Sequence, residues 1–244
     1  MIRGLWNSLA GILPRMIHQE VASNNLANIT TTGFKMDRPF MKSYLDAQLI
    51  AEQDRDKYSR LLEVEDIQTN FSQGLFEQTG NPLDLAIMGD GFFTIQTDAG
   101  IVYTRNGNFS INANSELVTS EGGRVLGDNG PITIEEGDIF INEQGEINID
   151  GDAIDKLRIT DFKKPYELTK AANNAFKPDN ASVRGFSAES YSIRHRFLER
   201  SNVVPVQEML NMIVYFRNYE ADTRIIQAQD ETLRRAVNDV GRGA

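Results

Sequence analysis

The chain has 244 residues, of which 40% are apolar and 25% charged, and its formal net charge is −10. This composition is typical of a folded protein and excludes a largely disordered chain. The absence of cysteine excludes disulfides and thiol chemistry. No apolar run approaches the ~20 residues that a bilayer-spanning helix needs. Residues 1–13 lack the small-residue cleavage site of a secretory signal peptide, so we expect a protein that stays in the cytoplasm or leaves without such a signal.

The charge is unevenly distributed. Residues 1–44 carry +3 and residues 194–244 carry +1, which leaves −14 for the residues between them. An acidic middle repels phosphate, which argues against nucleic acid as a partner. Near-neutral ends can approach copies of themselves without strong repulsion. The alternative interpretation is that the acidic middle is simply a well-solvated surface.

Residues 1–34 are expected to contain a first helix. Leu5, Leu9, Ile12 and Met16 recur at steps of three and four residues, which is typical of a heptad seam. Pro14 lies inside this pattern and predicts a kink or a helix start close to it. The polar run at residues 28–33 predicts the end of the helix.

The spacing of apolar residues changes in the middle of the chain. Residues 35–80 form a connecting segment that we expect to be partly ordered, in which Phe40, Tyr44, Leu45 and Leu49 could share a helical face. Residues 81–162 contain many short apolar runs separated by Gly, Asn or Asp, which predicts a central all-β domain that folds independently. Residues 163–197 contain a polar loop and a return strand.

Residues 198–244 contain the strongest helix signal. Pro205 suits a first helical turn, and Asn202 is a candidate cap. A helix of about 30 residues would be roughly 45 Å long, which favours a coiled coil or other extended packing. The predicted fold is α+β, with N- and C-terminal helices that form a coiled-coil-like core element, and with a central all-β domain. One side of this closing helix carries Val206, Met209, Ile213, Phe216 and Ile226, with Tyr219 nearby.

No catalytic, cofactor-binding or metal site is predicted. His18 and His195 have no second ligand in zinc spacing, and both are interpreted as solvent-facing. Gly89-Asp90-Gly91 leads into a strand pattern and is interpreted as a tight turn. Arg105, beside a turn, is interpreted as a surface ion-pair partner.

Three blocks resemble flagellar rod and hook proteins. Residues 22–28, Ala-Ser-Asn-Asn-Leu-Ala-Asn, followed by Thr-Gly-Phe-Lys at 32–35, resemble the N-terminal signature of that family. Residues 83–93, 103–109 and 117–119 resemble its β domain. Residues 198–203, 208–213 and 217–221 resemble its closing helix, and 227–230 and Leu233 extend the match. Pro14 and Asp222 depart from the family pattern, which has no proline there and commonly has Asn at the second position.

The resemblance implies a structural subunit of the flagellar basal-body rod. Its partners would be copies of itself, other rod subunits and the flagellar export apparatus, with no small-molecule substrate, and it would be exported unfolded without a cleaved signal to the basal body. Asn side chains on a helix can fix register between neighbours. The predicted assembly residues lie in the helices and the motifs beside them: Leu5, Leu9, Ile12, Met16, Asn24, Asn25, Leu26, Asn28, Gly33, Phe34, Ser201, Asn202, Val206, Met209, Ile213, Phe216, Tyr219 and Ile226.

The subunit type has alternatives. The chain is shorter than hook proteins and lacks the Gly-rich stretch after the first helix that is typical of the distal-rod (FlgG) type. Residues 130–134, Gly-Pro-Ile-Thr-Ile, are closer to the proximal-rod (FlgF) type. We therefore expect a proximal-rod subunit, with the distal type as the alternative. An enzyme on a β scaffold and a cytoplasmic coiled-coil adaptor are the rival classes.

Overall fold

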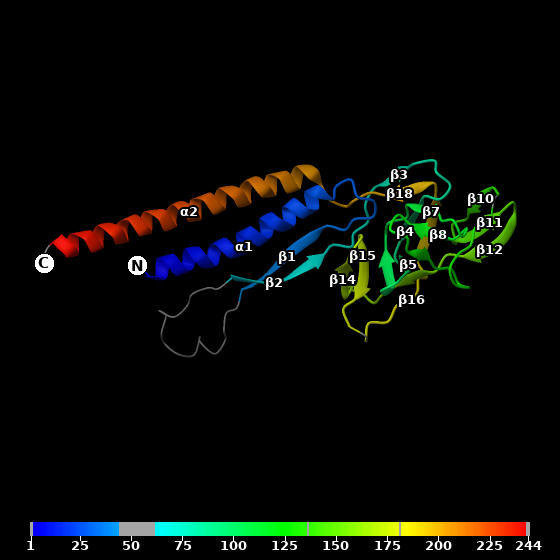
Figure 1. Cartoon of the computed structure of the whole chain (residues 1–244), viewed down its shortest axis with the longest axis horizontal. Coiled ribbons are helices and arrows are strands. Elements are labelled where there is room, and N and C mark those ends of the chain that lie inside the picture. Colours follow the sequence, from blue (N-terminus) through cyan, green and yellow to red (C-terminus); the bar gives the residue numbers. More distant parts are fainter. Residues whose placement is uncertain (1, 44–61, 136, 181, 243–244) are drawn as a thin grey trace. The chain divides into compact units, whose positions relative to one another are not determined.

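The computed structural model describes residues 2–43, 62–135, 137–180 and 182–242 (Figure 1). The chain forms two compact units. The first, here called the helical unit, comprises Met1–Ala27, Met36–Asn70 and Val203–Ala244, and the second, here called the β unit, comprises Asn28–Lys35 and Phe71–Asn202. The α+β class with a largely β middle is confirmed.

The helical unit is built on α1 (Ile2–Ala27) and α2 (Pro205–Arg242), which lie side by side (Figure 1). The antiparallel pair β1 (Asp37–Ser43) and β2 (Leu62–Thr69) packs against α1. α1 continues through Pro14 without ending there. The coiled-coil character of the helix pair stays a prediction.

Two local expectations for these segments differ from the structure. Asn202 lies outside the cap position of α2, because the helix begins three residues later at Pro205 and its first backbone bond runs from Glu208 N to the Val204 carbonyl. The Asn202 Nδ2 donates to the Ser72 carbonyl at 3.0 Å. Phe40 lies in β1 rather than on a helix, beside Pro39, which suits a strand edge better than a helix interior. Tyr44, Leu45 and Leu49 lie outside the described residues.

The β unit contains short strands separated by tight turns. Several turns use a left-handed backbone, at Ser115, Asp150, Asn173 and Asn174 and at glycines such as Gly100. The strands are β3 (Phe76–Gln78), β4 (Leu85–Gly89), β5 (Phe92–Thr97), β6 (Gly100–Thr104), β7 (Phe109–Ile111), β8 (Leu117–Thr119), β9 (Arg124–Val125), β10 (Ile139–Ile141), β11 (Glu146–Ile149), β12 (Asp152–Lys156), β13 (Ile159–Asp161), β14 (Leu168–Ala171), β15 (Ala175–Pro178), β16 (Phe186–Ser187), β17 (Tyr191–His195) and β18 (Phe197–Glu199).

One large antiparallel sheet organises the β unit. Its strand order is β14-β15-β6-β5-β9-β8-β7, and β13 joins β5 to β16. Smaller pairings are β10-β11-β12, β17-β4 and β18-β3. The main core lies between these sheets and includes Leu85, Ile87, Phe93, Ile147 and Ile193. A second cluster of buried residues gathers Phe92, Phe162, Leu168 and Phe176, with Phe71 and Tyr166 packed against it.

The segment after residue 162 contains more strands than its sequence predicted. Residues 163–190, interpreted as a polar loop, contain β14, β15 and β16. Their alternation is short and interrupted by Pro165 and Pro178, which hides a strand pattern in the sequence. β17 then pairs with β4 over its whole length, from Tyr191 opposite Gly89 to His195 opposite Leu85. The core of the β unit therefore includes residues well beyond 162.

We predict that Ile193→Ala lowers the free energy of unfolding of the β unit by about 2–5 kcal/mol, because it removes buried methyl groups from the core. Urea unfolding of the full chain, followed by circular dichroism, measures the change. Ile101→Ala is the matched control, since about half of Ile101 is exposed. Equal effects of the two changes would contradict the assignment of β17 to the core.

Candidate assembly surfaces

The seam between α1 and α2 contains polar side-chain contacts. Arg15 forms an ion pair with Asp222 and donates to the Asn218 carbonyl at 2.9 Å. The His18 ring stacks on Tyr215 with centroids 4.8 Å apart. His18 was interpreted as solvent-facing, but it is partly covered by this stacking, and burial lowers the pKa of its imidazole.

Asn25 joins three elements of the helical unit. Its side chain is buried and forms two bonds with the Asp37 backbone, donating from Nδ2 to O and accepting at Oδ1 from N, both at 2.9 Å. Its Nδ2 also lies 3.3 Å from Oε2 of the buried Glu208. An open groove of about 390 Å³ lies beside this junction, lined by apolar Val21 and Ala22 among others. Asn25 thus ties α1 to both β1 and α2.

The side of α2 that faces away from this seam is apolar in its first turns. At least half of each large side chain is exposed there, from 50% for Met209 and Phe216 to 67% for Val206. We call these residues the apolar patch: Val206, Met209, Leu210, Ile213, Val214 and Phe216. Farther along α2, exposed ion pairs such as Glu220–Arg224 and Glu231–Arg235 lie among only two exposed large apolar residues that the structure describes there, Ile225 and Leu233. The apolar patch thus holds most of the exposed large apolar residues on the described part of α2.

The remaining predicted residues of the helical unit divide between seam and surface. Met16 and Asn24 are exposed, whereas Ile12 and Leu26 are half-buried. Tyr219 and Ile226 are also half-buried on α2. Leu5 and Leu9 lie in α1, but their side chains are outside the described residues.

The β unit holds a buried cluster of three charges. Glu199 is fully buried, with Oε1 2.5 Å from Lys35 Nζ and Oε2 3.4 Å from Arg105 Nη1. The backbone N–H of Gly74 donates to the same carboxylate at 2.8 Å. Lys35 also donates to the Ser72 carbonyl at 2.8 Å. Burial lowers the pKa of Lys35, and the nearby Glu199 carboxylate opposes that change.

The position of Arg105 corrects its interpretation as a surface residue. Only 4% of Arg105 is exposed, and its guanidinium donates to the carbonyls of Ile87 at 3.2 Å and Gly89 at 2.8 Å. Its carboxylate partner, Glu199, lies 94 residues away in the sequence. A local sequence window therefore contains no sign of the pairing.

Gly33 and Phe34 lie against the same cluster. The Gly33 N–H donates to the Glu199 carbonyl at 2.7 Å. Gly33 has a φ of +67°, and a Cβ there would lie 2.4 Å from the Arg105 backbone carbon, so only glycine fits. Phe34 is buried beneath the Lys170 ammonium, which lies 4.1 Å from the ring centroid.

The other predicted residues of the β unit flank this site. Asn28 Oδ1 accepts from the Thr31 hydroxyl at 3.2 Å, in the turn after α1. Ser201 and Asn202 are half-buried just after β18. The structure therefore brings Gly33 and Phe34 together with Arg105 and Glu199, two residues that the list of predicted assembly residues did not contain.

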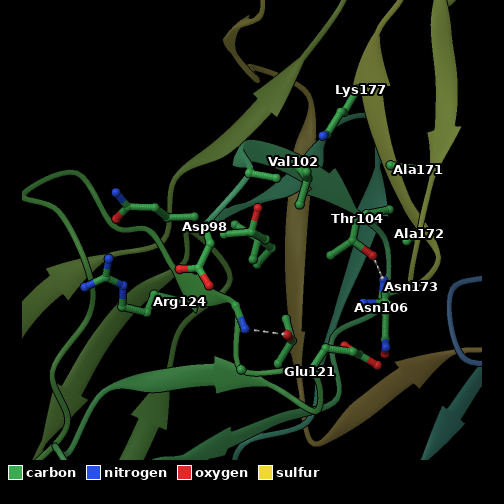
Figure 2. Close-up of a pocket in the computed structure, with 18 of the residues that line it drawn as sticks. Asp98, Val102, Thr104, Asn106, Glu121, Arg124, Ala171, Ala172, Asn173 and Lys177 are labelled. Atoms are coloured by element: carbon green, nitrogen blue, oxygen red, sulfur yellow. Dashed lines mark hydrogen bonds between the residues drawn. The ribbon is translucent and has the colours of Figure 1, made fainter.

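A groove of about 440 Å³ lies among the hairpin turns of the β unit (Figure 2). Its lining includes buried Ile95, and its rim mixes Asp98 and Glu121 with Arg124 and Lys177. The residues that line it include neither His nor Cys. Glu116 also lines the groove and lies 3.8 Å from Arg124.

Two further features concern ions and membranes. In the part of the chain that the structure describes, no three or more His, Cys, Asp or Glu side chains gather where a metal ion could bind. His195, at the end of β17, is partly buried, with Nε2 2.9 Å from the Pro82 carbonyl oxygen. Neither described helix combines the length and apolarity that crossing a membrane requires.

Comparisons with known proteins match the same three blocks. Residues 15–35 match the family described as flagella basal body rod protein, 86–149 the flagellar hook protein FlgE/F/G D1 domain, and 194–239 the flagellar basal body rod FlgEFG protein C-terminal. The flagellar basal-body rod protein FlgG of Borreliella burgdorferi is 31% identical over 261 residues, covering 98% of each chain.

Two other relatives match along most of the chain. The flagellar basal-body rod protein FlgF of Caulobacter vibrioides is 29% identical over 226 residues, covering 91% of each chain. The flagellar hook-basal body complex protein FlhO of Bacillus subtilis is 24% identical over 270 residues, covering 99% of this chain and 100% of its own. The similarity therefore extends over both the helical and the β segments.

We predict that Glu199→Gln lowers the free energy of unfolding by about 3–5 kcal/mol, because it leaves two buried cations without their carboxylate. Glu189→Gln, at an exposed carboxyl of the same unit, should change it by less than about 0.5 kcal/mol. Urea unfolding of the full chain compares them. An unchanged midpoint for Glu199→Gln would refute the stabilising role of the cluster.

Proposed function

This chain belongs to the flagellar basal-body rod protein family, and we propose that it is a rod subunit that assembles with copies of itself and other rod subunits through its helical unit. The observation that carries this proposal is the apolar patch on α2. Six large apolar side chains lie in three turns, each half or more exposed. Burying them between subunits would contribute favourable free energy, at about 25 cal/mol per Å² of apolar surface.

The distribution of charge along the chain also supports assembly through the helical unit. The two terminal segments that form the helix pair are close to neutral, whereas the middle of the chain is strongly acidic. Copies of the helical unit can therefore approach closely, while the acidic segments repel one another and favour positions apart. Tyr219 and Ile226 share the helical face of Glu208 and Tyr215, so in this proposal they pack toward α1 rather than extend the apolar patch. Leu5, Leu9, Ile12 and Met16 would supply the side of α1 that meets neighbouring subunits.

The proposed role is structural, and the proposed location is the basal body. The family is one of structural rod proteins rather than enzymes. We propose export without a cleaved signal peptide, with the flagellar export apparatus as a transient partner, as the resemblance to the rod family implies. Neither a catalytic residue nor a cofactor enters this proposal.

The rod type stays a prediction. Relatives named FlgG and FlgF both match over nearly the whole chain, so their names do not separate distal from proximal rod. The expected proximal type rests on the charged residues 45–66 and on residues 130–134. A cytoplasmic adaptor would instead stay in the cell body, so locating the tagged chain in purified basal bodies distinguishes the two classes.

We predict that Ile213→Asp abolishes rod completion and motility, because an unpaired carboxylate would enter a seam that becomes buried on assembly, at a cost of several kcal/mol per contact. Ile213 is about half exposed in the single chain, so the purified subunit should keep its circular dichroism spectrum and melting temperature. Swimming and rod length in isolated basal bodies are the measurements.

Gln227→Asp is the matched control. It places the same new charge at an exposed position of α2 beyond the apolar patch, where charged side chains already predominate. This variant should build rods and swim. Normal rods from Ile213→Asp cells would eliminate the apolar patch as the assembly surface.

A further inference from the structure

Three side-chain contacts between α1 and α2 are evenly spaced on α2. Glu208, Tyr215 and Asp222 are seven residues apart and therefore lie on one face, two helical turns from each other. All three are polar, and each meets a polar residue of α1. The apolar side chains of the first turns of α2 lie on its other side and are exposed. The three polar contacts therefore lie in the interface between the two helices, beside buried Val21 and Ala22 of α1.

The partners run in opposite directions along the two helices. Asn25 meets Glu208, His18 meets Tyr215, and Arg15 meets Asp222. The sequence number falls on α1 as it rises on α2, so the pair is antiparallel. One register satisfies all three contacts together.

Apolar contacts alone would not define that register as well as these polar contacts do. Similar apolar side chains fit similar holes when one helix slides by a heptad, whereas polar side chains lose their specific partners. After such a slide, Arg15 would face Tyr215 or Gln229 instead of a carboxylate, and Asp222 would lose its guanidinium. Only 14% of the Asp222 side chain is exposed, so its charge would be poorly solvated without a partner.

We infer that the ion pair between Arg15 and Asp222 is the positioning contact that fixes the register of α1 along α2. Among the three contacts it is the one between full opposite charges, and Arg15 adds a second bond to the Asn218 carbonyl one turn away. The Asn25–Glu208 contact, at 3.3 Å, and the His18–Tyr215 stack are weaker discriminators. The register is a property of the single subunit. Its consequence is that the apolar patch has a fixed position for neighbouring subunits, and this consequence rests on the proposed function.

Cysteine crosslinking tests the register directly, because the chain has no cysteine of its own. Cysteines at positions 18 and 215 report the native register, since those rings stack in the structure. Cysteines at 25 and 215, or at 18 and 208, report a slide by one heptad in either direction. A short bis-maleimide crosslinker on the purified full-length protein gives the yield for each pair.

Charge reversal then asks whether the pair sets the register. Arg15→Asp, which places two carboxylates together, should lower the native crosslink yield by about tenfold relative to the slide reporters. Arg15→Asp combined with Asp222→Arg should restore it. Arg224→Asp, the same change at an exposed arginine on α2, is the matched control and should leave the yield unchanged.

The outcomes separate the inference from its alternatives. Asp222→Asn, which keeps the shape and removes the charge, should give an intermediate loss and serves where Arg15→Asp fails to fold. Native crosslinking that persists in both Arg15→Asp and Asp222→Asn would overturn the inference, as would an exchanged pair that stays at the level of the single reversal. The crosslinking yields are measured on the isolated subunit. A negative result would therefore overturn the register inference and leave the rod proposal, which Ile213→Asp tests, intact.

Discussion

One buried carboxylate organises the β unit. Glu199 binds Lys35 from the segment after α1 and Arg105 from the end of β6, and Arg105 in turn holds the carbonyls of Ile87 and Gly89. The three residues come from the start, middle and end of the chain, and they belong to the three blocks that resemble the rod family. Because a buried ion pair costs much desolvation, its value lies in specificity: removing Glu199 would leave both buried cations without a carboxylate. Gly33 fits there only because it has no Cβ.

The helical unit combines a paired helix face with an exposed apolar one. The contacts between α1 and α2 include polar ones from Arg15, His18 and Asn25, beside buried Val21 and Ala22, whereas the apolar patch on α2 is exposed. Burying that patch between subunits, as proposed, would add apolar stabilisation that the single chain lacks. The helical unit would then be more stable in the rod than alone.

Sequence periodicity anticipated the elements better than their contacts. The strands around Phe93, Val102 and Val118 were predictable because apolar runs alternate with turn residues. The apolar stripe from Val206 to Phe216 was also visible, but periodicity cannot tell whether a stripe faces a partner helix in the same chain or in another. Glu208, Tyr215 and Asp222 add little to a hydrophobic pattern, so periodicity did not point to their particular contacts with α1. The Lys35–Glu199 pair spans 164 residues and could not be found by any local pattern.

These long separations also constrain the order in which the subunit can form. The charge cluster is complete only when residues 35, 105 and 199 are all present, and β4 lacks its partner until β17 is available. Contacts between residues so far apart form slowly, because the chain must close large loops before any contact stabilises them. α2 follows directly after β18, so the apolar patch enters last in chain order. The residues that complete the β unit and the apolar patch proposed for assembly therefore both lie near the end of the chain. A chain that stops before residue 199 lacks the completed charge cluster as well as the apolar patch.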